Sequence, residues 1–190
     1  MDTLPESIGS LNQLTDLFLE NNQINTLPAT FADLSNLIEL RLYSNKLAEL
    51  PESFGGFEDL LDLYLNDNLL SRLSDNFGSM NNLKRLRLNS NKLDSVPVSI
   101  VNMSNLEQLW LQNNQLANLP DEIGVLDSLV ILKIDNNILE SIPGSVGSLE
   151  NLKELNLDNN ELISLPESLC NIYNDLDFFS VSNNKLCPGS

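Results

Sequence analysis

The chain has 190 residues, with 27 acidic and 10 basic side chains, a formal net charge of −17 at pH 7 and no histidine. This charge argues against binding to nucleic acid or to an anionic membrane by bulk electrostatics, and the missing histidine excludes Ser/His and Cys/His catalytic pairs. At 42% hydrophobic residues the composition is globular, and no run of 18 apolar residues predicts a membrane span.

A leucine pattern repeats along the whole chain. It reads L-x-x-L-x-L-x-x-N-x-L-x-x-L and opens at Leu14, Leu37, Leu60, Leu83, Leu106, Leu129, Leu152 and Leu176. The interval between successive openings is constant, except that the last interval is longer by a single residue. A fixed period of this size is typical of a solenoid, whose stacked turns share one core. We therefore predict one domain over residues 1–190, with a partial repeat at 1–13, eight repeats and a C-terminal end at 187–190.

The segment 1–13 matches the back half of a repeat, because Leu4-Pro5 occupies the place that Leu27-Pro28 occupies one repeat later. No polar capping module precedes it, although the ends of solenoids usually need one. A basic segment followed by an apolar run, which would mark a signal peptide, is not visible. This beginning inside a repeat predicts that the sequence is a segment of a longer protein.

Each repeat opens with a strand pattern. Polar and apolar residues alternate from Gln108 to Gln112 around Leu109 and Leu111, and a period of two predicts a short strand with buried leucines. The outer part of the repeat has apolar residues at spacing three, which suits one helical or 3₁₀ turn. We therefore expect an α/β solenoid that curves around a parallel β-sheet on its concave face, with the short turns outside.

One asparagine follows every predicted strand and turns the chain. Its side chain is predicted to bond the backbone of its own turn and of the neighbouring turns, which satisfies polar groups at a buried corner. This structural asparagine ladder consists of Asn22, Asn45, Asn68, Asn91, Asn114, Asn137, Asn160 and Asn184.

Two departures from the repeat pattern concern the core. Phe31, Phe54 and Phe77 replace the outer isoleucine in three consecutive repeats, and we expect them to enlarge the core rather than to bind a cofactor. The last repeat has Phe179 at a core strand position, and one residue is inserted before it, near Tyr173. No cofactor is predicted from any part of the sequence.

The outward residue in the middle of each strand forms what we term the central column. In chain order this column contains Phe18, Arg41, Tyr64, Arg87, Trp110, Lys133, Asn156 and Ser180. Aromatic and basic residues alternate over its first six members, close enough in stacked strands for cation–π contacts. Exposed Trp, Tyr and Arg are the residue types enriched in binding hot spots. We therefore predict a ligand-binding concave face formed by Phe18, Arg41, Tyr43, Tyr64, Arg85, Arg87, Trp110 and Lys133.

These repeats resemble those of leucine-rich repeat proteins. The ending L-P-x-S-I-G-x-L-x-N-L, nearly whole at Leu4 to Leu11 and at Leu50 to Leu60, resembles the 23-residue type. The resemblance implies a non-catalytic module that binds a protein or peptide on its concave face, as part of a larger receptor, scaffold or regulatory protein. Family members exposed to oxidising conditions often close their C-terminal end with a disulfide, which suggests Cys170 with Cys187. The alternative is two small hydrophobic side chains without a bond, because the cysteines occupy different places around the coil.

Two other functions compete with this module. An enzyme is disfavoured by the missing histidine, and Asp135 beside Asp158 is interpreted as a solvated acidic strip rather than as a catalytic or metal site. The remaining alternative is a binder of a repeating target, such as a glycan or ice, on the polar column just before the asparagine ladder. That column contains Asn21, Ser44, Asp67, Ser90, Asn113, Asn136, Asn159 and Asn183. The sequence leaves the partner, the oligomeric state and the location open.

Overall fold

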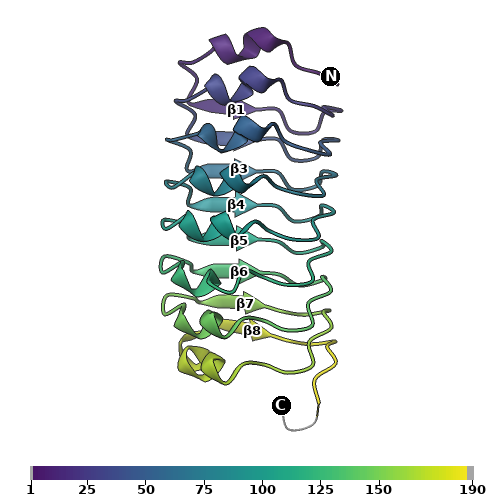
Figure 1. Ribbon diagram of the computed structural model, residues 1–190, viewed down its shortest axis with the longest axis vertical. Coiled ribbons are helices and arrows are strands. Elements are labelled where there is room, and N and C mark those ends of the chain that lie inside the picture. The colour runs from purple at the N-terminus through teal and green to yellow at the C-terminus, as the bar shows by residue number, and fades with distance from the viewer. Residues whose placement is uncertain (1, 188–190) are drawn as a thin grey trace.

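The computed structural model describes residues 2–187, so Met1 of the predicted partial repeat and residues 188–190 of the predicted C-terminal end lie outside the described residues. Eight short parallel strands form one sheet in the order of the chain (Figure 1). They are β1 (Asp16–Phe18), β2 (Glu39–Arg41), β3 (Asp62–Tyr64), β4 (Arg85–Arg87), β5 (Gln108–Trp110), β6 (Ile131–Lys133), β7 (Glu154–Asn156) and β8 (Phe178–Ser180). Each strand pairs with the residues one repeat later, as Leu63 does with Leu86, so the sequence period is the register of the sheet.

Short 3₁₀ turns lie opposite the sheet, and the core lies between the two layers (Figure 1). The turns are η1 (Glu6–Ser10), η2 (Ala29–Asp33), η3 (Glu52–Gly56), η4 (Asp75–Ser79), η5 (Val98–Asn102), η6 (Ile123–Val125), η7 (Gly144–Ser148), η8 (Glu167–Asn171) and η9 (Tyr173–Asp175). The residue inserted before the last repeat is accommodated in η9. The predicted curved solenoid, with a parallel sheet on its concave face and 3₁₀ turns outside, is confirmed.

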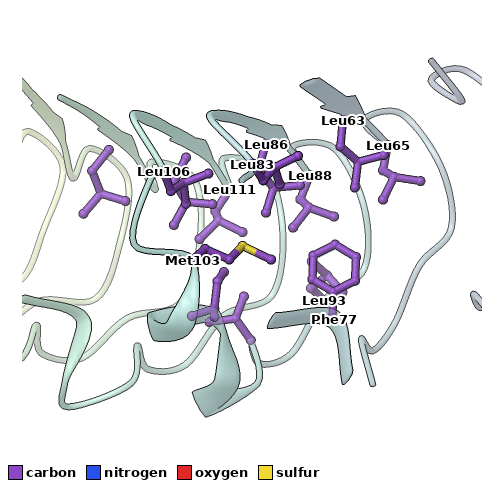
Figure 2. Packing of buried hydrophobic residues seen from close by; sticks show 14 of the residues in the cluster. Leu63, Leu65, Phe77, Leu83, Leu86, Leu88, Leu93, Met103, Leu106 and Leu111 are labelled. Carbon is purple, nitrogen blue, oxygen red and sulfur yellow. The ribbon is translucent and has the colours of Figure 1, made fainter. Parts of the chain in front are cut away.

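Leucines from successive turns form one continuous core. Leu63, Leu86 and Leu106 are completely buried, and they project from the sheet towards the outer turns, where Phe77 and Met103 fill the space (Figure 2). Equivalent leucines in the next turns repeat these contacts. Because no single turn can bury its leucines alone, each turn depends on its neighbours for stability.

The three phenylalanines that the sequence assigned to the core lie in it. Phe31, Phe54 and Phe77 are at most 1% exposed. Phe54 stacks with the other two rings at 6.3 Å between ring centroids. Phe57, which the sequence analysis did not single out, meets Phe54 edge-on at 5.2 Å. This aromatic cluster fills the core between η2 and η4.

The asparagine ladder joins each turn to the turn before it. The side-chain amide of Asn91 donates to the carbonyl oxygens of Leu65 and Leu88, both at 3.0 Å. Its side-chain oxygen accepts a hydrogen bond from the backbone N–H of Leu70 at 3.0 Å. Asn22 stands at the N-terminal end, and within residues 2–187 its side chain bonds only its own turn, at the carbonyls of Leu19 and Glu20.

A second column of polar side chains forms hydrogen bonds between successive turns, at the point where each turn leaves the outer layer. Each of its members donates a hydrogen bond to a carbonyl oxygen 24 residues earlier, at 2.7–2.9 Å. The members are Asn36, Asn82, Asn105, Ser128 and Asn151. The sequence analysis missed this column, although Asn or Ser directly before the opening leucine was a visible signal.

The polar column just before the asparagine ladder has a role in the backbone. All eight of its residues have a positive φ, between 52° and 57°. Asn and Asp adopt this left-handed conformation more readily than other residues with a side chain. The turn that ends each strand therefore accounts for the regular, polar character of this column, which was the basis for considering a glycan or ice as the target.

The disulfide suggested by the family resemblance is not formed in this structure. Cys170 is an exposed free thiol in η8, on the outer side of the solenoid. Cys187 follows the last strand, where its backbone N–H donates to the carbonyl oxygen of Ile163 at 3.4 Å. The two cysteines thus lie on different sides of the coil.

Amide hydrogen exchange is expected to be fastest at the N-terminal edge. Within the described residues strand β1 pairs only with β2, and Leu17 and Leu19 are only partly buried, whereas Leu109 in β5 is completely buried. Amides in residues 2–30 should therefore exchange faster than those in residues 106–128, as measured by mass spectrometry at matched intrinsic rates. Equal protection in the two segments would show that another contact covers this edge.

Candidate functional site

The central column forms a continuous stack of aromatic rings and cations along the concave face. The guanidinium carbon of Arg41 lies 4.2 Å from the ring centroid of Phe18 and 5.8 Å from that of Tyr64. That of Arg87 lies 5.1 Å from Tyr64 and 4.0 Å from Trp110. The ammonium of Lys133 lies 5.0 Å from the Trp110 ring. All of these distances fall within the range of cation–π attraction.

All eight residues predicted to bind a ligand lie on this face. Six belong to the central column in β1 to β6, Arg85 opens β4, and Tyr43 follows β2 by two residues. A shallow depression of about 330 Å³ lies among Arg41, Tyr43, Tyr64, Asn66 and Arg87. The parallel register brings the residues of this depression together from three successive repeats.

Three of the four cations on this face are paired with carboxylates. Arg41 Nε lies 2.7 Å from Glu39, and Lys133 Nζ lies 2.8 Å from Glu154. The hydrogen bond to Glu39 raises the pKa of Arg41, which holds the pair in its charged form. The Arg41–Glu39 pair joins two residues of one strand, and the Lys133–Glu154 pair joins two neighbouring strands. In both pairs the carboxylate stands two residues before the central column, and the cation compensates its charge.

Arg85 pairs with the most buried carboxylate of these ion pairs. It donates through Nε to Asp62 Oδ1 and through Nη2 to Asp62 Oδ2 at 2.6 Å. The side chain of Asp62 is only 10% exposed. This two-point hydrogen bond, together with the charge of Asp62, raises the pKa of Arg85. Arg85 therefore stabilises a buried carboxylate, and this contact occupies a residue that the sequence predicted as a ligand anchor.

Arg87 is the exception. Within residues 2–187 it makes no ion pair, and its Nε is buried without a hydrogen-bond partner. The indole Nε1 of Trp110 beside it is also buried and unpartnered. Buried polar atoms normally have partners, so unpartnered donors on a concave surface indicate where a ligand would bind.

Amide side chains next to Arg87 have unused acceptors as well. We term their position the trailing column, which contains Glu20, Tyr43, Asn66, Asn89, Gln112, Asp135, Asp158 and Ser182. The side-chain oxygens of Asn66, Asn89 and Gln112 are buried and, in the described part of the chain, accept no hydrogen bond. The sequence analysis did not single these residues out, although three successive repeats carry Asn or Gln there. Together with Arg87 and Trp110, they provide both donors and acceptors for a polar chain.

The trailing column becomes acidic beyond Gln112. Asp158 accepts hydrogen bonds from Ser180 Oγ at 2.6 Å and from the backbone N–H of Ser182 at 2.5 Å. Burial raises the pKa of Asp135, and the nearby charge of Asp158 adds to this effect. Among the residues that the structure describes, no group of three or more acidic, Cys or His side chains is placed to hold a metal ion.

The family description Leucine Rich Repeat matches residues 36–57, 105–126 and 151–172. No curated protein matches the chain. Within the described residues, none of the helices is long and apolar enough to cross a membrane.

Several solved structures have the same fold. The leucine-rich repeat protein LIC12759 of Leptospira interrogans is 34% identical, with a TM-score of 0.93, and the match covers 100% of this chain and 48% of that one. The ectodomain of the receptor kinase GASSHO1/SCHENGEN3 of Arabidopsis thaliana, in complex with CASPARIAN STRIP INTEGRITY FACTOR 2, is 30% identical, with a TM-score of 0.84 and coverages of 97% and 23%.

The plant peptide hormone receptor RGFR1, in complex with RGF2, is 30% identical, with a TM-score of 0.75 and coverages of 96% and 34%. The chain thus spans about half of the Leptospira protein and a smaller share of the two plant receptors. The matched repeats, the similarity along the whole chain and the parallel sheet in the register of the sequence period show that this chain is a leucine-rich repeat protein.

Proposed function

We propose that this chain is a non-catalytic module that binds a protein or peptide on its concave face, within a larger receptor, scaffold or regulatory protein. The observation that carries the proposal is Arg87. It is a cation held between two aromatic rings with an unpartnered buried N–H, beside a depression lined by further polar and aromatic groups. Such a combination of Arg, Tyr and Trp is typical of the centre of a binding surface.

The comparisons support a polypeptide as the ligand class. Two of the similar structures are plant receptors solved with the partners CASPARIAN STRIP INTEGRITY FACTOR 2 and RGF2. In this chain, the amides of Asn66, Asn89 and Gln112 offer unused acceptors that match the backbone N–H groups of a peptide. The wide spread of these groups over three strands suits an extended ligand better than a compact small molecule.

Substitutions on the concave face are expected to weaken binding strongly. Peptides selected from a displayed random library against the unmodified protein would serve as ligands, and their affinities would be measured by calorimetry. Trp110→Ala or Arg87→Glu should each weaken binding by about 2 kcal/mol or more, roughly 30-fold in Kd. Binding should also shift the fluorescence of Trp110, the only tryptophan.

The matched control is Glu122→Lys, an exposed change on the outer side. It should leave affinity unaltered, and thermal unfolding should show that all three variants are folded, because none of the residues belongs to the leucine core. If the control weakens binding while the Trp110 and Arg87 variants do not, the outer side is the recognition surface and the proposal is wrong.

A further inference from the structure

The concave face carries an uneven distribution of uncompensated charge. Of the four cations on this face, Arg41, Arg85 and Lys133 have carboxylate partners. The fourth, Arg87 in β4, has none among the described residues. The acidic residues of this face that have no ion pair lie towards its two ends. They are Asp16 and Glu20 at β1, and Asp135 and Asp158 just beyond β6 and β7.

The two acidic ends differ. Glu20 lies near Arg41, and its charge contributes to the raised pKa of that arginine, so it is partly compensated within the protein. Asp135 and Asp158 stand on adjacent strands at the same position of the repeat, and Lys133, the cation nearest to them in β6, is engaged by Glu154. Neither carboxylate makes an ion pair in the described part of the chain. Burial, together with the charge of Asp158, raises the pKa of Asp135, and the charge of Lys133 offsets this only in part. An added cation would therefore gain most at this end.

The spacing between the cation and the acidic pair is set by the sheet. Asp135 follows β6 and Asp158 follows β7, two and three strands beyond Arg87 in β4. Neighbouring strands lie about 4.8 Å apart, so these separations are roughly 10 and 14 Å. An extended polypeptide advances about 3.3–3.4 Å per residue, so the same distances correspond to about three or four residues.

We infer that the peptide segment bound on the concave face carries an acidic side chain at Arg87 and a basic side chain four residues away, at Asp135 and Asp158, because side chains at an even separation of an extended strand face the same side. The inference rests on the proposed function and specifies the charge pattern of its ligand. The acidic side chain of the peptide pairs with Arg87, which lies between Tyr64 and Trp110 and has no partner of its own among the described residues. The basic side chain of the peptide pairs with the two aspartates. The peptide residues between the two charges contact Trp110 and Gln112, which are neutral.

The test compares peptides selected from one displayed random dodecapeptide library on different variants. On the unmodified protein, selected peptides should be enriched in an acidic and a basic residue four positions apart, relative to the unselected library. On Asp135→Lys, the basic residue should disappear from the selected set or be replaced by an acidic one. Asp121→Lys, an exposed substitution of the same chemistry on the outer side, should return the original pattern.

A binding cycle then separates recognition from loss of folding. For one selected peptide, changing its basic residue to Gln should weaken binding to the unmodified protein about tenfold. The same change should have little effect on Asp135→Asn/Asp158→Asn, which removes both charges while keeping the shapes of the side chains. Selected peptides that need Arg87 and Trp110 but lack the charge pair, or an unchanged pattern on Asp135→Lys, would overturn this inference and leave the proposed function intact. Failure to select any peptide that depends on Arg87 and Trp110 would overturn both.

Discussion

Replacing Asn114 by leucine is expected to lower the free energy of unfolding by about 1–3 kcal/mol. The Asn114 side chain donates to the carbonyl oxygens of Leu88 and Leu111 and accepts from the backbone N–H of Leu93. The two carbonyls also accept hydrogen bonds from Asn91 and Asn137, so they keep partners in the variant. The N–H of Leu93 has no other acceptor in the described part of the chain and would be buried without one, which is the largest part of the cost.

Gln115→Leu is the matched control for this substitution. Gln115 is the next residue, it is exposed, and the equivalent positions Leu69 and Ile138 already carry exposed aliphatic side chains. Urea unfolding followed by circular dichroism would compare the two variants with the unmodified protein. Equal midpoints for Asn114→Leu and the unmodified protein would show that the asparagine ladder does not stabilise the fold.

Gly78→Ala is expected to destabilise the protein by about 2–3 kcal/mol through a steric clash. A Cβ atom at Gly78 would lie 1.9 Å from the carbonyl oxygen of Ser99 in the next outer turn, a distance that requires η4 and η5 to move apart. Val101 occupies the equivalent position one repeat later, where it faces η6, which is a shorter turn than η5. The expected response is therefore local separation of two turns with loss of their packing.

The control for this clash is Gly56→Ala, in the same kind of outer turn. A Cβ atom at Gly56 would lie 3.8 Å from Ala32 Cβ, an ordinary van der Waals contact. Alanine also restricts the unfolded chain more than glycine, so this variant should gain between about 0 and 1 kcal/mol. Comparable losses of stability in both variants, measured by calorimetry, would show that the cost comes from the backbone and not from the contact with Ser99.

The sequence period was sufficient to predict the fold because it is also the hydrogen-bonding register. Leu63 pairs with Leu86 because both occupy the same position of the repeat, and the same rule places Arg87 between Tyr64 and Trp110. The alternation of aromatic and basic residues in the central column could therefore be converted into neighbouring side chains without a structure.

The pairing of the individual cations was not predicted, although the register contains part of the answer. Arg85 and Arg87 lie two residues apart in one strand, yet Arg85 pairs with Asp62 and Arg87 has no carboxylate partner in the described part of the chain. The register places Asp62 directly opposite Arg85, and Tyr64 and Trp110 on either side of Arg87. The burial of Arg87 Nε without an acceptor, in contrast, depends on side-chain positions that a pattern of residue types does not contain. The positive φ before each ladder asparagine was also missed, because Ser44 and Ser90 interrupt the Asn and Asp signal.

The asparagine ladder gives the solenoid a polarity under mechanical load. From Asn45 to Asn184, each ladder side chain accepts a hydrogen bond from a backbone N–H of the turn before it, as Asn184 does from Leu162. Detaching the C-terminal turn therefore leaves a buried N–H of the remaining turn without its acceptor. Detaching the N-terminal turn takes away from Asn45 its bonds to Ile24 and Leu19, while its bonds to its own turn stay in place. A pulling force should therefore peel turns from the N-terminal end, and each released repeat would add about 80 Å of contour length.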